Sequence, residues 1–573
     1  MKYKTKTYRM MKIKNLLAVI CAIATLSATA QQKAQPSWLK DAVIYHIYPL
    51  TYMDSDGNGI GDLEGIRSKL DYIKSVGFNC IWMSPCFVSA WEDGGYDILD
   101  FYKVDPRFGT NDDLKRLIDD AHSKGIKILL DLVAGHTSDK HPWFQESLKA
   151  ERNEFSDYYI WTEGHTMPQP SFRWVDNSYP RNGIYLSNFF PIQPALNYGY
   201  YKVNPANSWE QDYNAPGPTA VRNELKKIIA FWCDMGADGF RVDMAQSLVK
   251  GDNKNRDGVR RLWNDIFAWY NQKYPENIML SEWSNPEQSL SAGFNIDLLI
   301  HNGLGGKVYR PLVCETSDKL VPTKCYFTRK GDGDIKKAMN LYTEIYNTYR
   351  KIGGYASMPT NSHDIWRLTR LNRTTPEEQK VAITLFLTLP TPPIVYYGEE
   401  IGMRNLEYAP AKEGSLSSRN RSVCRTPMQW NTERHAGFST VKDARKLYLP
   451  VDYSFTFPNV AEQEKDDNSV LAYVKGLLKL RAATPALGVA GEWKYVGDLD
   501  NPYPMIYSRT LGDEKYVVVF NPADREVEGK IAPLGKKSEW VYGNDEKLAK
   551  CKTSKEGHTF KMQPVSVAIF KIK

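Results

Sequence analysis

The hydrophobic positions of the chain fall into two alternating patterns. Short, nearly continuous apolar runs predict buried strands, and the segments between them have the apolar spacing of amphipathic helices. Strand followed by helix, repeated, is typical of a parallel sheet covered by helices. The predicted strands are residues 41–52, 78–85, 127–133, 239–244, 278–283, 296–300, 355–360 and 393–397. The predicted helices are residues 63–77, 111–125 (capped by Asn111), 219–237, 258–274, 335–352, 376–388 and 470–481.

Eight strand candidates with intervening helices predict an α/β fold, a (β/α)8 TIM barrel. A doubly wound sheet also alternates in this way, but it rarely needs eight such units in a row. Residues 136–207 break the pattern with aromatic, Pro- and Asn-rich sequence that is too long for a simple loop. This stretch predicts a subdomain inserted after the third strand. After residue 481 the apolar positions recur every second residue, as in residues 515–520, which predicts a C-terminal antiparallel β-domain.

These patterns divide the chain into three parts that follow a short leader. The predicted barrel comprises residues 38–136 and 208–488. The insertion comprises residues 137–207, and the C-terminal β-domain comprises residues 489–573.

The leader, residues 1–30, has the layout of a secretory signal peptide. Six basic residues and no acidic residue precede a short apolar run, which ends in Ala28-Thr29-Ala30 before Gln31. The apolar run is short for a membrane span, and no stop-transfer flank follows, so a retained anchor is the less favoured alternative. We therefore expect an exported protein, periplasmic or secreted, with no membrane attachment after cleavage.

The net charge changes meaning once this leader is removed. The full chain carries a formal charge of +7, whereas residues 31–573 contain 68 Lys and Arg against 67 Asp and Glu, a charge of +1. A nearly neutral chain gives no electrostatic reason to expect a nucleic acid or an anionic membrane as partner.

Seven of the eight cysteines would remain after cleavage, and an odd number leaves at least one thiol free or bonded to another molecule. No pair has the CxxC spacing, so thiolate zinc and thioredoxin-like redox chemistry are not expected. Cys314 and Cys325 are close enough in sequence for a disulfide to close a short loop, and a pair of free thiols is the equal alternative.

Charged residues stand where four of the predicted strands end, and in a barrel this is where catalytic groups gather. On the fourth strand Arg241 and Asp243 project to the same face, and the cation keeps the carboxylate ionised, as a nucleophile requires. Glu282 follows Met279-Leu280 and precedes Trp283, apolar surroundings that can raise its pKa and keep a proton. Two such carboxyl groups are what cleavage of a glycosidic bond needs.

The four stretches at residues 131–136, 239–243, 281–283 and 361–364 resemble, in order and spacing, four short regions of the α-amylase superfamily, glycoside hydrolase family 13. The likeness runs from about residue 41 to the C-terminus and implies a domain B after the third strand and a β-sandwich domain C. It implies that Asp243 is the nucleophile of a retaining, double-displacement mechanism, Glu282 the general acid/base and Asp364 a third carboxylate on the sugar. It also implies that the same glucose contacts Arg241, His136 and His363, with Asp131 in support.

Within that superfamily the chain resembles exo-acting α-glucosidases of the oligo-1,6-glucosidase group. Tyr96 matches the residue that stacks on the glucose, and Asp97 is expected to accept hydrogen bonds from the sugar's 4- and 6-hydroxyls, with Arg425 of the R-T-P-M-Q-W stretch as its partner cation. Met244, which follows the nucleophile, matches neither the α-1,6 nor the α-1,4 pattern. We expect hydrolysis of short malto-oligosaccharides, mainly at α-1,4 bonds, with α-1,6 bonds as a second target.

The loop Asp54-Ser-Asp-Gly-Asn-Gly-Ile-Gly-Asp62 offers oxygen ligands at Asp54, Asp56, Asn58, Asp62 and the Ile60 carbonyl. Alternating carboxylates around glycine turns suit a hard cation, so we expect structural Ca²⁺ or Mg²⁺ here, with a polar turn as the alternative. The loop also resembles the cation loop of oligo-1,6-glucosidases. Gly135 stands where many α-amylases have a calcium-ligating Asn, so that second site is not expected. No organic cofactor is expected.

Three alternatives remain on sequence grounds. A trehalose synthase-like transglycosylase would share the catalytic residues, and an endo-acting α-amylase would share the fold. A non-catalytic sugar-binding or transporter-accessory member typically loses catalytic carboxylates, whereas all three are present here. The partner expected is an oligosaccharide substrate, and the chain is a monomer or an oligomer whose state the sequence does not specify.

Overall fold

An eight-stranded parallel barrel forms the centre of the protein. The computed structural model describes residues 35–573 except 169–172, 177, 314–323, 371–372 and 414–419. The strand order is β11-β10-β9-β8-β5-β2-β1-β12, and a parallel bridge between Pro359 and Ile394 closes the ring. The strands are β1 Ile44–Ile47, β2 Cys80–Met83, β5 Lys127–Leu132, β8 Gly239–Val242, β9 Ile278–Ser281, β10 Ile296–Leu298, β11 Tyr355–Ser357 and β12 Ile394–Tyr396. The predicted fold class is confirmed, and all eight predicted strands contain one of these.

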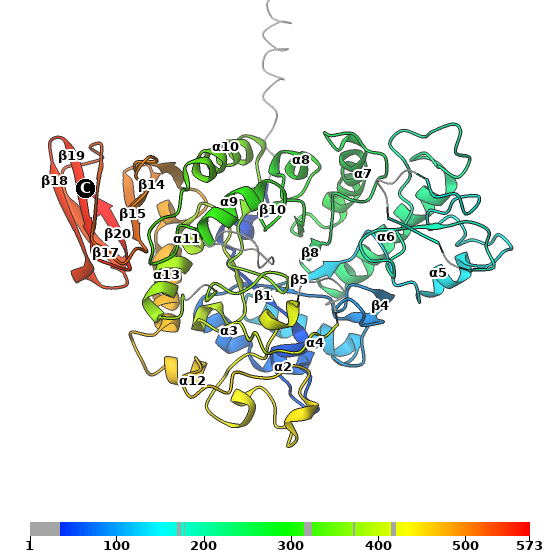
Figure 1. The fold of residues 1–573 in the computed structure, drawn as a ribbon, viewed down its shortest axis with the longest axis horizontal. Coiled ribbons are helices and arrows are strands. Elements are labelled where there is room, and N and C mark those ends of the chain that lie inside the picture. Colours follow the sequence, from blue (N-terminus) through cyan, green and yellow to red (C-terminus); the bar gives the residue numbers. More distant parts are fainter. Residues whose placement is uncertain (1–34, 169–172, 177, 314–323, 371–372, 414–419) are drawn as a thin grey trace, which may run out of the picture.

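Helices surround the barrel (Figure 1). They are α2 Leu63–Ser68, α3 Leu70–Val76, α4 Asn111–Ser123, α6 Pro216–Met235, α7 Asp257–Lys273, α8 Pro286–Ser291, α9 Gly303–Val313, α10 Lys336–Ile352, α11 Pro376–Thr388, α12 Val460–Gln463 and α13 Val470–Ala483. The N-cap of α4 is Thr110 rather than the predicted Asn111, because Thr110 and Asp113 form a reciprocal capping box. The Asn111 side chain instead accepts from Val104 N at 2.8 Å.

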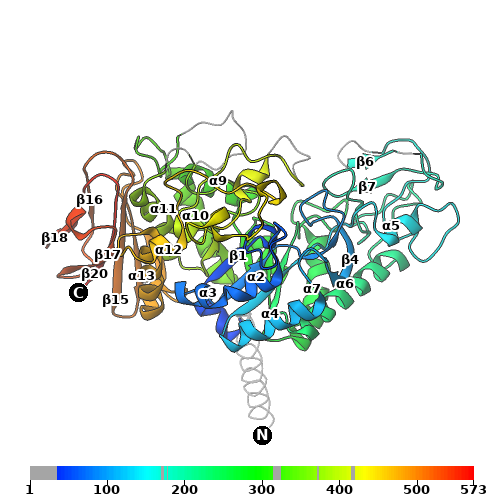
Figure 2. The same ribbon diagram turned by 90° about the horizontal axis from the view of Figure 1, so that it is seen from below.

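The insertion after β5 forms a lobe at one end of the molecule (Figures 1 and 2). It contains α5 Pro142–Ser147 and the antiparallel pair β6 Arg173–Val175 and β7 Tyr185–Ser187. A small apolar cluster of its own includes Ile160, Ile184 and Leu186. The antiparallel pair β3 Phe87–Ser89 and β4 Ile98–Val104 follows β2 and carries the loop of Asp93 and Asp97.

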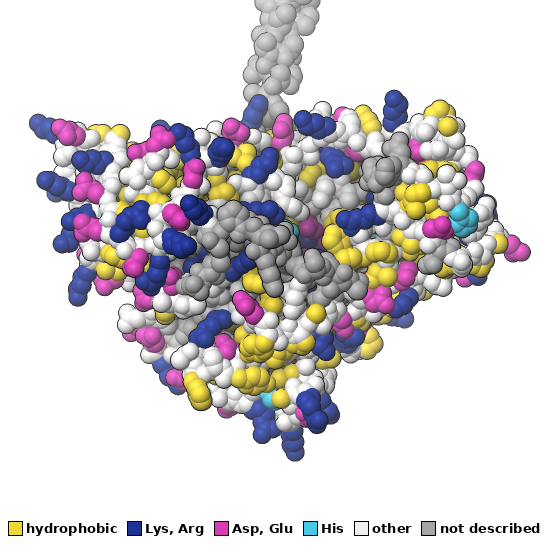
Figure 3. All heavy atoms as spheres, viewed as in Figure 1, with side chains coloured by type: hydrophobic (Ala, Val, Ile, Leu, Met, Phe, Trp, Pro, Cys, Tyr) yellow, Lys and Arg dark blue, Asp and Glu magenta, His cyan; other side chains and the backbone are white. Residues whose placement is uncertain are grey.

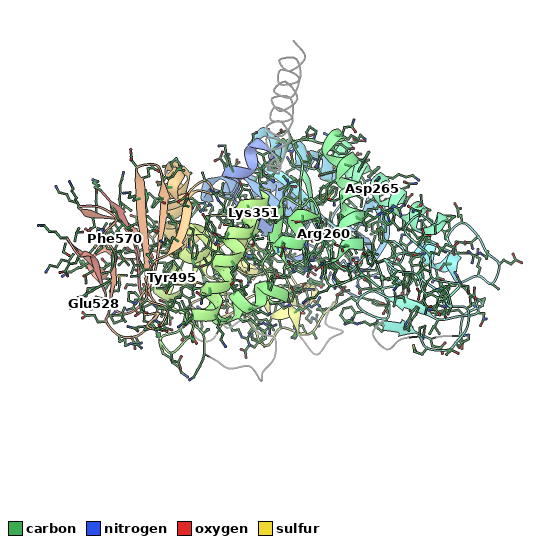
Figure 4. The ribbon with its side chains drawn as sticks, turned by 90° about the horizontal axis from the view of Figure 1, so that it is seen from above. Arg260, Asp265, Lys351, Tyr495, Glu528 and Phe570 are labelled. Atoms are coloured by element: carbon green, nitrogen blue, oxygen red, sulfur yellow. The ribbon has the colours of Figure 1, made fainter. Side chains whose placement is uncertain are left out.

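Two antiparallel sheets form the opposite end of the molecule. The larger contains β13 Glu492–Tyr495, β14 Met505–Leu511, β15 Glu514–Asn521, β20 Ser566–Ile572 and β17 Ser538–Gly543, and the smaller contains β16 Val527–Ile531, β19 Gly557–Met562 and β18 Ala549–Ser554. Phe560 and Phe570 pack between the sheets with ring centroids 5.3 Å apart. Figure 4 shows Phe570 and Glu528 at this end, with Lys351 of α10 between them and Arg260 of α7.

The surface carries charged side chains of both signs. On the face seen in Figure 3, cationic and anionic side chains are interspersed, and neither sign gathers into one extended patch. Among the described residues no helix is long and apolar enough to cross a membrane.

Cys325 is disulfide-bonded, whereas its predicted partner Cys314 lies outside the described residues, as does the predicted leader 1–30.

Candidate active site

One buried guanidinium binds three carboxylates, one within strand β5 and two that follow the neighbouring strands β8 and β9. Arg241 lies on β8, and its Nη1 donates to Asp131 Oδ1 at 2.9 Å and to Asp243 Oδ1 at 3.0 Å. Its Nη2 donates to Glu282 Oε2, just after β9, at 2.6 Å. The side chains of Asp243 and Glu282 remain 10% and 14% exposed, whereas that of Asp131 is fully buried. Asp243 and Glu282 therefore can meet a substrate, and Asp131 holds the arginine in place.

The two accessible carboxyl groups of this trio differ in their affinity for a proton. Burial raises the pKa of Glu282 to about 7, against the opposing effect of Arg241. Burial raises the pKa of Asp243 to about 6, opposed by Arg241 and by a hydrogen bond from Glu282. The higher pKa of Glu282 favours it as the proton carrier of this coupled pair and Asp243 as the ionised partner. This is the assignment of acid and nucleophile that the sequence predicts.

Asp364, which follows β11, lies among three cationic or polar donors. Arg425 Nη2 lies 3.0 Å from its Oδ1, Arg421 Nη1 lies 3.1 Å from the same oxygen, and His363 Nε2 lies 3.2 Å from Oδ2. Burial alone would raise the pKa of Asp364, but Arg421 and the other donors hold it well below its usual range. Asp364 therefore stays ionised, and its side chain is 24% exposed.

Arg421 and Asp93 belong to the site although they were not predicted from the sequence. Arg421 Nη1 lies 3.4 Å from Asp93 Oδ1, and Gln193 Nε2 donates to Asp93 Oδ2 at 2.7 Å. Burial raises the pKa of Asp93 to about 6, and its charge acts on both Asp243 and Asp364. Arg421 stands four positions before the predicted Arg425, and Asp93 stands four positions before the predicted Asp97. A second residue of the same charge in each loop was the sequence signal that could have identified them.

Asp97 differs from the expectation that it binds sugar hydroxyls. Its carboxylate is fully buried and accepts from Glu92 N at 2.8 Å, Asp93 N at 3.1 Å and Ser89 Oγ at 2.8 Å. These bonds fold the loop on itself and use both carboxylate oxygens. Arg425 is likewise not its partner, because that guanidinium lies on Asp364. The role expected of Asp97 is therefore better matched by Asp93.

Tyr96 and His363 contact carboxylates of the site, and His136 contacts Tyr96. Tyr96 donates to Asp131 Oδ2 at 3.0 Å, and its ring stacks on that of His363 with centroids 5.2 Å apart. Burial lowers the pKa of both His136 and His363 to about 4, so both imidazoles are neutral near pH 7. His136 Nδ1 accepts from Asn188 Nδ2 at 3.1 Å, and Nε2–H donates to the Tyr96 carbonyl at 2.9 Å. In the ligand-free site both His136 nitrogens are thus engaged with protein.

The Asn188 side chain occupies the space beside Gly135, and Lys250 contacts Asn188. A Cβ at Gly135 would lie 2.6 Å from Asn188 Nδ2, so the Asn188 amide fills this space. Lys250 Nζ lies 3.4 Å from Asn188 Oδ1, and burial lowers the pKa of that ammonium to about 7. The Lys250 amine therefore lies beside the amide that occupies the space next to Gly135.

Three of the five predicted metal ligands lie together. Carboxylate oxygens of Asp54, Asp56 and Asp62 lie within 4.8 Å of one another. Asp54 also accepts from Gly57 N and Gly59 N, and Asp62 caps α2 through Gly65 N at 2.6 Å. Asn58 Oδ1 accepts from Ile60 N at 2.8 Å, so the amide faces the loop. The donor set consists of hard oxygens and fits Ca²⁺ or Mg²⁺.

Comparison with known proteins agrees with this geometry. Residues 46–489 match the family described as alpha amylase, catalytic domain. A trehalose synthase/amylase of Mycolicibacterium smegmatis is 31% identical over 83% of this chain and 81% of its own length. The oligo-1,6-glucosidase of Parageobacillus thermoglucosidasius is 29% identical over 85% of this chain and 91% of its own. The solved trehalose-6-phosphate hydrolase of Bacillus licheniformis superimposes with a TM-score of 0.76 and 25% identity, over 94% of this chain and all of that one.

Proposed function

The chain belongs to the α-amylase family of glycoside hydrolases, and we propose that it hydrolyses α-glucosidic bonds of short malto-oligosaccharides with Asp243 as nucleophile and Glu282 as acid/base. The observation that carries this proposal is the single guanidinium shared by Asp243 and Glu282, whose proton affinities differ in the required order. Their adjacency favours the retaining mechanism, in which the two carboxyl groups lie close together.

In the first step the ionised Asp243 attacks C1 of the bound glucose while Glu282 gives its proton to the glycosidic oxygen. The C1–O bond breaks, the shortened sugar leaves as an alcohol, and a β-glucosyl ester of Asp243 forms. Glu282, now ionised, takes a proton from water as that water attacks C1. The ester breaks, Asp243 is regenerated, and glucose leaves with the α configuration. Arg241 donates to both carboxylates throughout and limits the cost of their shared negative charge.

Substrate length follows from the charged group around Asp364. Asp93, Asp364, Arg421 and Arg425 form a connected set beside the catalytic pair. Paired charges of this kind bind the hydroxyls of a terminal glucose by charge-assisted hydrogen bonds. Relatives named oligo-1,6-glucosidase and maltase are consistent with short substrates. Met244, which follows the nucleophile, is apolar and flexible and therefore excludes neither linkage. We assign mainly α-1,4 bonds, with α-1,6 bonds as a second target.

The test is a product profile on maltose, isomaltose, sucrose and starch, with the anomer released read by NMR. We expect α-glucose from maltose. Trehalose as the main product would instead assign a trehalose synthase-like activity, which a relative of that name keeps open, and internal cleavage of starch would assign an endo-acting amylase.

A matched pair of variants tests the two roles. Asp243→Asn should lower kcat by several orders of magnitude, as removal of a nucleophile does. With α-glucosyl fluoride as substrate, Glu282→Ala should accumulate the glucosyl ester, because fluoride departs without an acid while water still needs a base. Added azide should release α-glucosyl azide, because azide attacks without needing a base. Full activity of Asp243→Asn would overturn its role as the nucleophile, whereas no hydrolysis by the native protein would assign a non-catalytic function.

We further propose that the Asp54–Asp62 loop holds a structural Ca²⁺ or Mg²⁺ and that the protein is exported to the periplasm or beyond. The oxygen donors of Asp54, Asp56 and Asp62 support the cation, and the leader sequence supports export.

A further inference from the structure

The peptide that carries Glu282 is a tight, strained turn. Glu282 N donates to Val242 O of β8 at 3.0 Å, which fixes one side of the turn. Two residues later Ser284 adopts φ 61°, a left-handed conformation that is unfavourable for a residue with a side chain. Something other than local preference therefore holds Ser284 in place.

Asp297 supplies that hold from the neighbouring strand. It lies in β10, opposite Ser281 in the register with β9, and it is fully buried. Its Oδ1 accepts from Ser281 Oγ at 2.8 Å and from Ser284 N at 3.0 Å, the two residues that bracket Glu282 and Trp283. Burial raises the pKa of Asp297 to about 7, and backbone N–H groups of residues 283–285 oppose that rise.

The far side of the turn is closed by the start of α9. Ser284 Oγ donates to Asn302 O at 2.9 Å and accepts from Gly305 N at 3.1 Å, and Leu304 N donates to Ser284 O at 3.0 Å. A Cβ at Gly305 would lie 2.3 Å from Ser284 Oγ, so only glycine allows this approach. These contacts fix Ser284 but not Ser281, and among the described residues Asp297 is the side chain that bonds to both.

We propose that Asp297 is a positioning residue for the acid/base Glu282. It holds the turn that follows β9, so that the carboxyl group of Glu282 can give its proton to the glycosidic oxygen. The inference rests on the proposed function of Glu282. A displaced carboxyl group loses its proton-transfer geometry, and misplacement by about 1 Å can cost on the order of 100-fold in rate. Attack by Asp243, which follows β8, needs no proton from Glu282 when the leaving group departs without acid assistance.

Leaving groups of different basicity separate positioning from general damage. Maltose needs a proton on its departing oxygen, whereas fluoride departs from α-glucosyl fluoride with little acid assistance. We expect Asp297→Ala to lower kcat/KM for maltose by about 30-fold or more and kcat/KM for α-glucosyl fluoride by less than about 3-fold. The kcat/KM ratio is the proper readout because it reports only steps up to the glucosyl ester.

Two further variants at this position keep the test decisive. Asp297→Asn retains the Oδ1 acceptor and should stay within about 3-fold of the native enzyme on both substrates. Asp297→Glu shifts the carboxylate by one methylene, and if Asp297→Ala does not fold, it should show the same preferential loss on maltose.

Asp238 provides a matched control in the same protein. It is another buried aspartate that accepts a backbone N–H, from Ile128 at 2.8 Å, but it precedes β8 at the other end of the barrel. Asp238→Ala should lower kcat/KM for maltose and kcat/KM for α-glucosyl fluoride by the same factor.

Equal losses on maltose and α-glucosyl fluoride in Asp297→Ala, or no loss on either, would overturn the positioning role. Glu282→Gln is measured alongside. If its kcat/KM falls by the same factor on maltose and on α-glucosyl fluoride, the assignment of Glu282 as acid fails, and the proposed function fails with it.

Discussion

At the scale of single residues, the site depends on which carboxyl group carries the proton. Burial alone would raise the pKa of Asp243, Glu282 and Asp364 alike, and the larger number of cationic and polar donors beside Asp364 separates it from the other two. Asp364 has Arg421 and Arg425, whereas Asp243 and Glu282 share Arg241. The distribution of arginines therefore separates Asp364, which stays ionised, from the coupled pair of Asp243 and Glu282.

The pH profile should report this pair directly. Asp243 must be ionised, and with a pKa of about 6 its loss of charge should lower kcat/KM below that pH. Glu282 must be protonated, and with a pKa of about 7 its ionisation should lower kcat/KM above that pH. We expect a bell-shaped profile on maltose whose two limbs belong to the coupled pair. A rate that stays constant from pH 7 to pH 9 would contradict the role given to Glu282.

Asp93 and Asp97 offer a second residue-scale prediction. Asp93→Ala should lower kcat/KM on maltose by roughly 100-fold or more, because Arg421 loses a partner beside the sugar. Asp97→Ala should instead destabilise the fold by about 2–4 kcal/mol, because buried loop donors lose their acceptor. Thermal unfolding and kinetics on both variants distinguish the roles. The reverse pattern, an inactive but stable Asp97→Ala, would restore the original assignment.

At the scale of elements, local sequence decides where strands and helices stop. Pro49 ends the predicted strand 41–52, so that β1 stops at Ile47 and a 3-10 turn follows at Pro49–Thr51. The predicted helix 63–77 is interrupted at Lys69, which ends α2 and begins α3. Helix α9 was not predicted, because Gly303, Gly305 and Gly306 mask its helical pattern. Two of these glycines let the helix approach Ser284, so the weak pattern has a packing reason.

The loop before α2 carries a prediction of its own. With a bound cation, removal by chelator should lower the unfolding temperature, because Asp54, Asp56 and Asp62 would then repel one another. Readdition of Ca²⁺ or Mg²⁺ should restore it, and calorimetry should detect binding to the metal-free protein. Asp56→Asn is the suitable variant, because Asp56 is exposed and caps no helix. If the unfolding temperature is unchanged in chelator and elemental analysis finds no ion, the loop is a polar turn that binds no metal.

At the scale of the whole molecule, Arg509 joins the C-terminal sheets to the barrel, and Arg481 binds the same end of α11 from within the barrel. Arg509 of β14 is fully buried and donates to the carbonyls of Thr388 at the end of α11 and, at 3.1 Å, of Leu487. Arg481 of α13 donates to Leu387 O and Leu389 O at 3.0 Å each. Both cations lie where the negative end of the α11 dipole points. The junction therefore depends on buried charge as well as on apolar contact.

Replacing Arg509 should loosen this junction. We expect Arg509→Met to lower the free energy of unfolding by about 3 kcal/mol or more, because carbonyls at the end of α11 lose their donor. Activity on maltose at 25 °C should change little, since the site lies within the barrel. Differential scanning calorimetry should show an earlier transition and, if the two parts separate, a second one. Exposed Arg445 provides the control, because Arg445→Met removes a cation without removing a buried contact.

The sequence by itself determined the order of strands and the chemical groups that follow them. In a parallel barrel each strand end leads to the same face, so Asp243, Glu282 and Asp364 had to converge there. Only the tertiary structure separated the two acids of one loop, because Asp93 joins the charged group around Asp364 and Asp97 bonds within the loop itself. Asp93 and Asp97 are four residues apart, and contacts with Gln193 and Arg421, distant in the chain, select Asp93. The same reason hid Asp297, whose partners near Glu282 belong to another strand.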